Sequence, residues 1–206
     1  MQNIPVDLPD ALWLKGYFAD YANPKAKIGR LVRQGALCRL KKGLYIKAEA
    51  AQNTYLLGKA ANRIYGPSYV SFVYALRWYG LIPEHVAHFT SATYGKGRKK
   101  RYDTAIGSFF YQDIPAGAYP YGIRFVGENQ SRFLMAFAEK ALCDELYRIS
   151  GIRSIKRIER LLFDDMRLDQ ALFGQLDHKA LISFAGKYNT LTLNTFLKFL
   201  GRYPGA

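Results

Sequence analysis

The spacing of apolar residues changes twice along the chain, and this change limits the folds that the chain can adopt. Helical spacing predominates from Asp7 to Tyr79, interrupted by short strand-like runs within 36–47. Residues 87–126 are instead rich in Thr, Phe, Tyr and Val and contain many Gly and Pro, which is typical of strands. Helical spacing returns from Phe137 onward. The pattern predicts an α+β protein with a strand-rich middle and C-terminal helices.

Two helices are predicted near the N-terminus. Asp7 is expected to cap a helix that extends to about Asp20, because apolar residues in this stretch follow an i, i+3, i+4, i+7 spacing. Asn23 and Pro24 supply the cap and the first-turn proline of a second helix. Gly35 is expected to end that helix.

A short hairpin is predicted directly after the second helix. Strand-like runs at 36–40 and 44–47 are joined by Lys41-Lys42-Gly43, read as a three-residue loop. A linker follows, so the sequence predicts a domain boundary near residue 50. Residues 1–50 would form a winged helix-turn-helix, and residues 51–206 a larger α+β domain.

The second helix has one basic face. Ile28, Leu31 and Val32 form its apolar stripe, and the small Ala26 and Gly29 would let the helix approach base edges. In a winged helix-turn-helix this helix enters the major groove of DNA and the hairpin forms the wing. The predicted DNA contacts are Lys25, Lys27, Arg30, Arg33, Gln34, Arg39, Lys41 and Lys42.

The charge of the whole chain favours a polyanionic partner, because its formal net charge is +14. A second basic cluster occurs between two strand-like runs, with Tyr94 and Tyr102 on either side of it. It could be an accessory DNA contact, the primary site of an RNA-binding protein, or a solvated hairpin tip. The cluster consists of Lys96, Arg98, Lys99, Lys100 and Arg101.

No catalytic, metal or cofactor site is predicted. The three histidines His85, His88 and His178 are scattered, and no glycine loop of the phosphate-binding type occurs. A metal-dependent nuclease is a weaker alternative, resting on acids such as Asp103, Asp113, Glu128 and Glu139. Lys140 and Asp144 have the i, i+4 spacing of an intrahelical ion pair.

The cellular location predicted from the sequence is the cytoplasm. No apolar run is long enough to span a membrane, and the N-terminus lacks the features of a secretory signal. Cys38 and Cys143 stand alone on apolar stretches, so we expect ordinary core residues in a reducing compartment.

Several short motifs occur along the chain in a characteristic order. In the predicted winged helix they are Asn23-Pro24, Lys27-Ile28, Leu31, Gly35 and the run from Arg39 to Tyr45. Beyond it they are Tyr65-Gly66-Pro67-Ser68-Tyr69, the run from Tyr79 to Glu84, and Glu139-Lys140-Ala141-Leu142-Cys143-Asp144. Together these motifs resemble the AbiEi family, the antitoxins and autorepressors of bacterial type IV toxin-antitoxin systems.

This resemblance implies a repressor that binds inverted repeats in double-stranded DNA of its own promoter. It also implies that the second domain antagonises a nucleotidyltransferase-like toxin without a stable complex. The protein would therefore have no enzymatic activity of its own.

Overall fold

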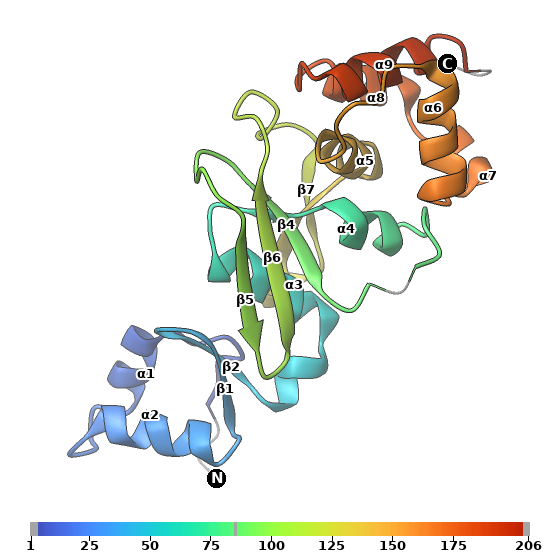
Figure 1. The fold of residues 1–206 in the computed structure, drawn as a ribbon. Coiled ribbons are helices and arrows are strands. Elements are labelled where there is room, and N and C mark those ends of the chain that lie inside the picture. Colours follow the sequence, from blue (N-terminus) through green and yellow to red (C-terminus); the bar gives the residue numbers. More distant parts are fainter. Residues whose placement is uncertain (1–3, 85, 204–206) are drawn as a thin grey trace.

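The computed structural model describes residues 4–84 and 86–203 and combines helices with two β-sheets, as an α+β fold (Figure 1). The α-helices are α1 (Ala11–Tyr17), α2 (Pro24–Arg33), α3 (Thr54–Ile64), α4 (Phe72–Trp78), α5 (Ala138–Tyr147), α6 (Ile155–Arg160), α7 (Gln170–Gly174), α8 (His178–Ala185) and α9 (Leu191–Leu200). The strands are β1 (Leu37–Lys41), β2 (Leu44–Lys47), β3 (Tyr69–Val70), β4 (Phe89–Thr93), β5 (Lys100–Thr104), β6 (Gly107–Asp113), β7 (Ile123–Val126) and β8 (Phe133–Ala136).

The N-terminal helix pair is shorter than the sequence predicts. Asp10, not Asp7, caps α1, and its carboxylate accepts a hydrogen bond from the Trp13 backbone. The reason is that the preceding segment is extended and pairs with β2: Tyr45 N–H donates to the Pro9 carbonyl, and Lys47 N–H to the Asp7 carbonyl. The end of the pair at Gly35 is confirmed, where φ is 72°.

The larger sheet has the strand order β5-β6-β4-β3-β8-β7. Strands β4 and β6 pair in parallel, as do β3 and β8, and the other pairs are antiparallel. The two-residue β3 thus lies inside the sheet, between β4 and β8. Strands β3 and β8 are absent from the predicted strand-rich region 87–126.

Helix α3 lies against one face of this sheet (Figure 1). The Tyr111 hydroxyl on β6 donates to the Ala61 carbonyl of α3, 2.7 Å away. At Gly58 the helix comes so near to β8 that an added Cβ would lie 2.7 Å from the Phe133 ring. Helices α4 and α5 pack together, and α8 and α9 cover α5.

The hairpin of β1 and β2 contributes to two apolar clusters. Leu37 belongs to a small cluster with α1 and α2, whereas Leu8, Leu40, Leu44 and Ile46 belong to the large core built around the sheet. The hairpin therefore joins the N-terminal helix pair to the rest of the molecule. Separating the chain into two fragments near residue 50 would expose apolar side chains on both fragments.

Both cysteines are free thiols within the core layers, Cys143 fully buried and Cys38 half-buried. The segment after α6 continues as a π-helix, Leu161–Asp165. Short 3₁₀-helices occupy Glu49–Gln52 and Asn129–Ser131. Within the described ranges, every helix is too short or too polar to cross a membrane.

Candidate nucleic-acid interface

Helix α2 is formed by the capping residues that the sequence predicts. The Asn23 side chain accepts a hydrogen bond from the Ala26 backbone at 3.0 Å, and Pro24 occupies the first turn. Ile28 is buried, and Leu31 and Val32 pack against the same small cluster. The opposite face, with Ala26, Arg30 and Arg33, is therefore turned to solvent.

Exposed cations gather on and beside this face. None of them forms an ion pair within residues 4–84 and 86–203. We call them the α2 basic surface, and its members are Lys15, Lys25, Arg30, Arg33 and Arg39. Gln34, the C-cap of α2, is exposed beside them.

Three of the four acids in residues 4–50 are held elsewhere, and the fourth, Asp20, is exposed before α2. Lys47 pairs with Asp7 and with Glu49, at 3.3 and 2.6 Å, and Arg63 of α3 pairs with Asp10. These pairs neutralise carboxylates at the junction with α3, so the α2 basic surface keeps its positive charge. Such a separation of charge concentrates positive potential on one face.

A shallow groove runs between α1, α2 and the hairpin. Its volume is about 230 Å³, and Lys15, Lys25 and Arg39 line it from three different elements. Gly29 forms part of its floor, where the lack of a side chain keeps the backbone of α2 accessible. The groove thus brings together cations that the sequence leaves up to 24 positions apart.

The hairpin turn is tighter than the three-residue loop that the sequence predicts. Lys41 belongs to β1, and the turn is the two residues Lys42 and Gly43. The Gly43 carbonyl accepts a hydrogen bond from the Ala11 backbone, which holds the turn against the start of α1. Lys42 is exposed beside this contact.

Lys41 makes contacts within the fold that the sequence does not predict. Its ammonium donates to the carbonyls of Arg63 and Ile64, at 3.0 and 2.7 Å, where α3 ends. A cation at this end complements the helix dipole. Burial, and secondarily the charge of Arg63, lowers the pKa of Lys41. Lys27 likewise contacts its own chain, with its ammonium 4.7 Å from the centre of the Tyr21 ring.

Replacement of Lys41 by Met should therefore affect folding and leave DNA binding unchanged. We expect the free energy of unfolding to fall by about 1 to 3 kcal/mol, because the carbonyls at the end of α3 lose their donor. Urea denaturation measures this change. Lys42→Met is the matched control, with an expected change within about 0.5 kcal/mol. A stable Lys41→Met protein with weakened DNA binding would restore the sequence-based assignment.

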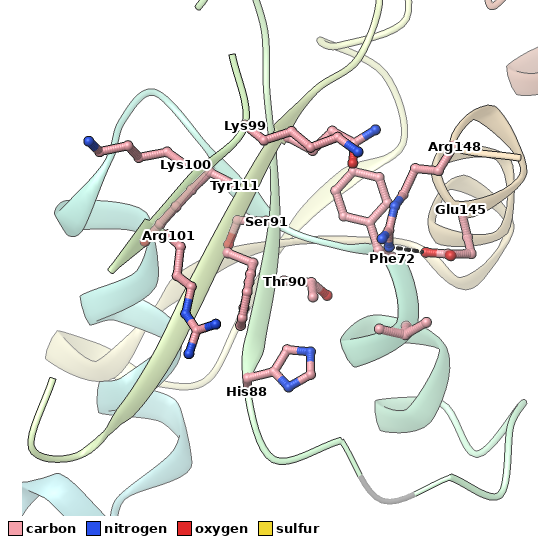
Figure 2. Close-up of a pocket in the computed structure, with 13 residues that line it drawn as sticks. Phe72, His88, Thr90, Ser91, Lys99, Lys100, Arg101, Tyr111, Glu145 and Arg148 are labelled. Carbon is pink, nitrogen blue, oxygen red and sulfur yellow. Dashed lines mark hydrogen bonds and ion pairs between the residues drawn. The ribbon is translucent and has the colours of Figure 1, made fainter. Parts of the chain in front are cut away.

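The second basic cluster is divided between the two faces of the large sheet. Lys96 donates to the Gly66 carbonyl on the α3 side, and Lys100 lies over the Tyr102 ring on that side. A cavity on the other face is lined by Lys99, Lys100 and Arg101, but Figure 2 shows the Lys100 side chain pointing away from the other two. Since β5 begins at Lys100, its alternating side chains account for this division. Arg98 is exposed in the preceding loop.

The flanking tyrosines do not frame a common stacking surface. Tyr102 packs among Tyr65 and Tyr111 on the α3 side, whereas Tyr94 packs on Tyr119. Asp113 binds the loop between them, accepting hydrogen bonds from the backbones of Lys96 and Gly97 at 2.6 and 2.7 Å. The loop is therefore an ordered connection.

Three of the four carboxylates considered for a nuclease, those of Asp103, Asp113 and Glu139, accept hydrogen bonds within the fold. Asp103 accepts from Arg101 and Ser108, and Glu139 from the Asp177 backbone. Among the described residues, no three His, Cys, Asp or Glu side chains form a group suited to a metal ion. His85 lies outside those residues.

The predicted intrahelical pair of α5 is confirmed and is fully buried. The Lys140 ammonium lies 2.6 Å from an Asp144 oxygen, and both side chains are 0% exposed. The other Asp144 carboxylate oxygen accepts hydrogen bonds from the hydroxyls of Ser71, at 2.6 Å, and Tyr69, at 3.0 Å. Tyr188 also donates to Asp144. Burial, and to a lesser extent the charge of Asp144, raises the pKa of Tyr69 and of Tyr188.

In comparisons with known proteins, no family model and no curated protein match this sequence. The chemistry of the α2 basic surface must therefore be inferred from its geometry and charge.

Proposed function

We propose that the protein binds double-stranded DNA through the α2 basic surface, as a winged helix-turn-helix transcriptional repressor. The observation that carries this proposal is the separation of charge in the N-terminal region. Five exposed cations on three elements lack carboxylate partners among the described residues, while three nearby acids are bound to Lys47 and Arg63.

The geometry of α2 suits the major groove, whose width of about 12 Å admits one helix. Ala26 is exposed and Gly29 lines the groove. Because both residues are small, neither keeps the backbone of α2 away from the bases. The side chains of Arg30 and Gln34 are exposed and long enough to reach base edges. Lys15, Lys25 and Arg39 would contact phosphates, which position the helix without reading sequence.

The biological role that we propose is that of an antitoxin which represses its own operon. It rests on the AbiEi-like motifs, which extend beyond the helix pair to Asp144 of α5. The operator would contain inverted repeats, and the region after residue 50 would oppose a nucleotidyltransferase-like toxin. A reporter behind the protein's own promoter tests repression, and co-expression with a toxin gene from the same operon tests rescue.

A salt titration tests the DNA proposal directly. Phosphate contacts by the four cations other than Arg30 should give a plot of log affinity against log salt with a slope of about −4, at ~0.9 per phosphate contact. Fluorescence anisotropy of a labelled duplex measures this slope between low and moderate salt. A slope near zero, or equal affinity for a neutral polymer, would refute electrostatic DNA binding.

Single substitutions separate α2 from the hairpin turn. Arg30→Ala should weaken binding by about 1 to 3 kcal/mol and relax the preference at one operator position, because Arg30 lies on the outward face. Lys42→Ala should lower the magnitude of the salt slope by less than ~0.9, the value for one phosphate contact, because the turn is held against α1. Affinities for operator and random duplexes provide the measurement. Equal losses on both duplexes would assign Arg30 to phosphate alone.

A further inference from the structure

A cavity of about 530 Å³ lies on the face of the large sheet that carries Lys99 and Arg101 (Figure 2). Strand β6 contributes Phe110 and Gln112, α4 contributes Phe72, and the end of α5 contributes Arg148. Its volume falls within the range of small-molecule sites, about 300 to 1,000 Å³. The DNA proposal makes no use of this cavity.

Cations from the start of β5 and from the end of α5 surround the cavity. Lys99 is exposed and points toward the part of the cavity where Arg148 lies (Figure 2). Arg148 is bound at 2.9 Å by Glu145, the one carboxylate in the cavity lining, and Arg101 is bound at 2.8 Å by Asp103. Lys99 therefore brings a positive charge that no described acid neutralises. A small anion is the complementary ligand.

Flat groups line the same cavity. The Arg101 guanidinium lies 5.0 Å from the centre of the half-buried Phe110 ring, and Arg148 lies 5.3 Å from that of Phe72. The His88 ring meets Phe110 edge-on at 4.7 Å. Guanidinium and aromatic planes of this kind stack on nucleobases.

The backbone at the cavity wall is strained. Phe72 has a φ of 58°, which is unfavourable for a bulky side chain. Thr90 holds this conformation in place, because its hydroxyl donates to the Ser71 carbonyl at 2.6 Å and accepts from the Tyr74 backbone at 3.2 Å. Strain of this kind is concentrated at ligand sites.

A second cavity, of about 330 Å³, shares Val73, His88 and Glu145 with the first. Its lining includes the carboxylates of Glu84 and Asp165. Arg167 and Arg157 pair with them, at 2.5 and 2.6 Å. The carboxylates that line the two cavities are therefore held by arginines, and the charge left unpaired among the described lining residues is positive. An anionic group would be directed toward Lys99 and Arg148.

We propose that this cavity binds a nucleoside phosphate, with the phosphate at Lys99 and Arg148 and the base against Phe110. The shared chemistry is a flat base joined to a phosphate. A free mononucleotide or the 5′-terminal nucleotide of an oligonucleotide would supply it. The site is separate from the α2 basic surface and does not depend on the DNA proposal.

Isothermal titration of the full chain tests the site with a series of probes. These are nucleoside monophosphates, the corresponding nucleosides, inorganic phosphate, and a 5′-phosphorylated dinucleotide. We expect a monophosphate to bind more tightly than either the nucleoside or inorganic phosphate. If only the dinucleotide binds, the ligand of the cavity is the 5′ end of a strand and not a free mononucleotide. Failure of every phosphorylated nucleoside to bind at millimolar concentration would overturn the proposal, as would equal binding of the nucleoside.

Matched variants locate the site. Lys99→Ala should weaken monophosphate binding about tenfold, as expected for loss of a charged hydrogen bond. Arg98→Ala removes the neighbouring exposed cation that does not line the cavity and should leave binding unchanged. Circular dichroism checks that both variants fold. Equal affinities of the two variants would place the ligand elsewhere and reject the site. Arg30→Ala should bind the nucleotide normally, which separates this result from the DNA proposal.

Discussion

Replacing Asp144 by Ala is expected to lower the free energy of unfolding by about 3 to 5 kcal/mol, the usual cost of breaking a buried ion pair. The variant would leave the Lys140 ammonium without its carboxylate in a fully buried position. It would also remove the acceptor of the Tyr69 and Ser71 hydroxyls. Urea denaturation followed by circular dichroism measures the loss.

An exposed pair of the same spacing provides the control. Arg160 and Asp164 are also i, i+4 neighbours, 3.9 Å apart, but their side chains are 69% and 72% exposed. Asp164→Ala should therefore change stability by less than about 1 kcal/mol. Similar losses in Asp144→Ala and Asp164→Ala would show that burial adds nothing to the pair in α5.

Removal of three cations from the α2 basic surface should nearly abolish DNA binding. In the combined variant Lys25→Ala, Arg33→Ala and Arg39→Ala, the salt slope should fall in magnitude by about three, at ~0.9 per lost phosphate contact. At about 1 kcal/mol per contact, affinity at a fixed salt concentration should drop roughly a hundredfold. Anisotropy titrations at several salt concentrations measure both quantities. All three side chains are exposed, so folding should be preserved.

The matched control removes three cations from the second basic cluster: Lys99→Ala, Lys100→Ala and Arg101→Ala. Because the Lys100 side chain points away from those of Lys99 and Arg101, we expect one duplex to contact at most two of the three. We therefore expect the magnitude of the salt slope to fall by less than about two, at ~0.9 per lost phosphate contact. A reduction as large as that of the α2 variant would make this cluster an equal DNA contact and contradict the proposed interface.

Local signals in the sequence predicted the helix boundaries well where capping residues act within a few positions. Asn23, Pro24 and Gly35 bound α2 as expected. The first helix was predicted too long because Asp7 and Asp10 are both plausible caps. Only the pairing of the preceding segment with β2, an interaction across the fold, selects Asp10.

The candidate sites were harder to predict because their residues meet through tertiary contacts. The role of Lys41 depends on carbonyls more than 20 positions away at the end of α3. The cavity joins Lys99 to Arg148 across β5 and α5, with no spacing pattern that relates them. The division of residues 99–101 between two faces follows from strand alternation, but only once the start of β5 at Lys100 is known.

The position of β3 inside the sheet sets an order for folding during translation. Val70 pairs with Met135, so the sheet cannot close before β8 has left the ribosome. At about 5 to 20 residues per second, the first 50 residues emerge several seconds before that moment. Until then the large apolar core to which Leu8, Leu40 and Ile46 belong is incomplete. Chain elongation, more than local folding, therefore determines when this core can form in full.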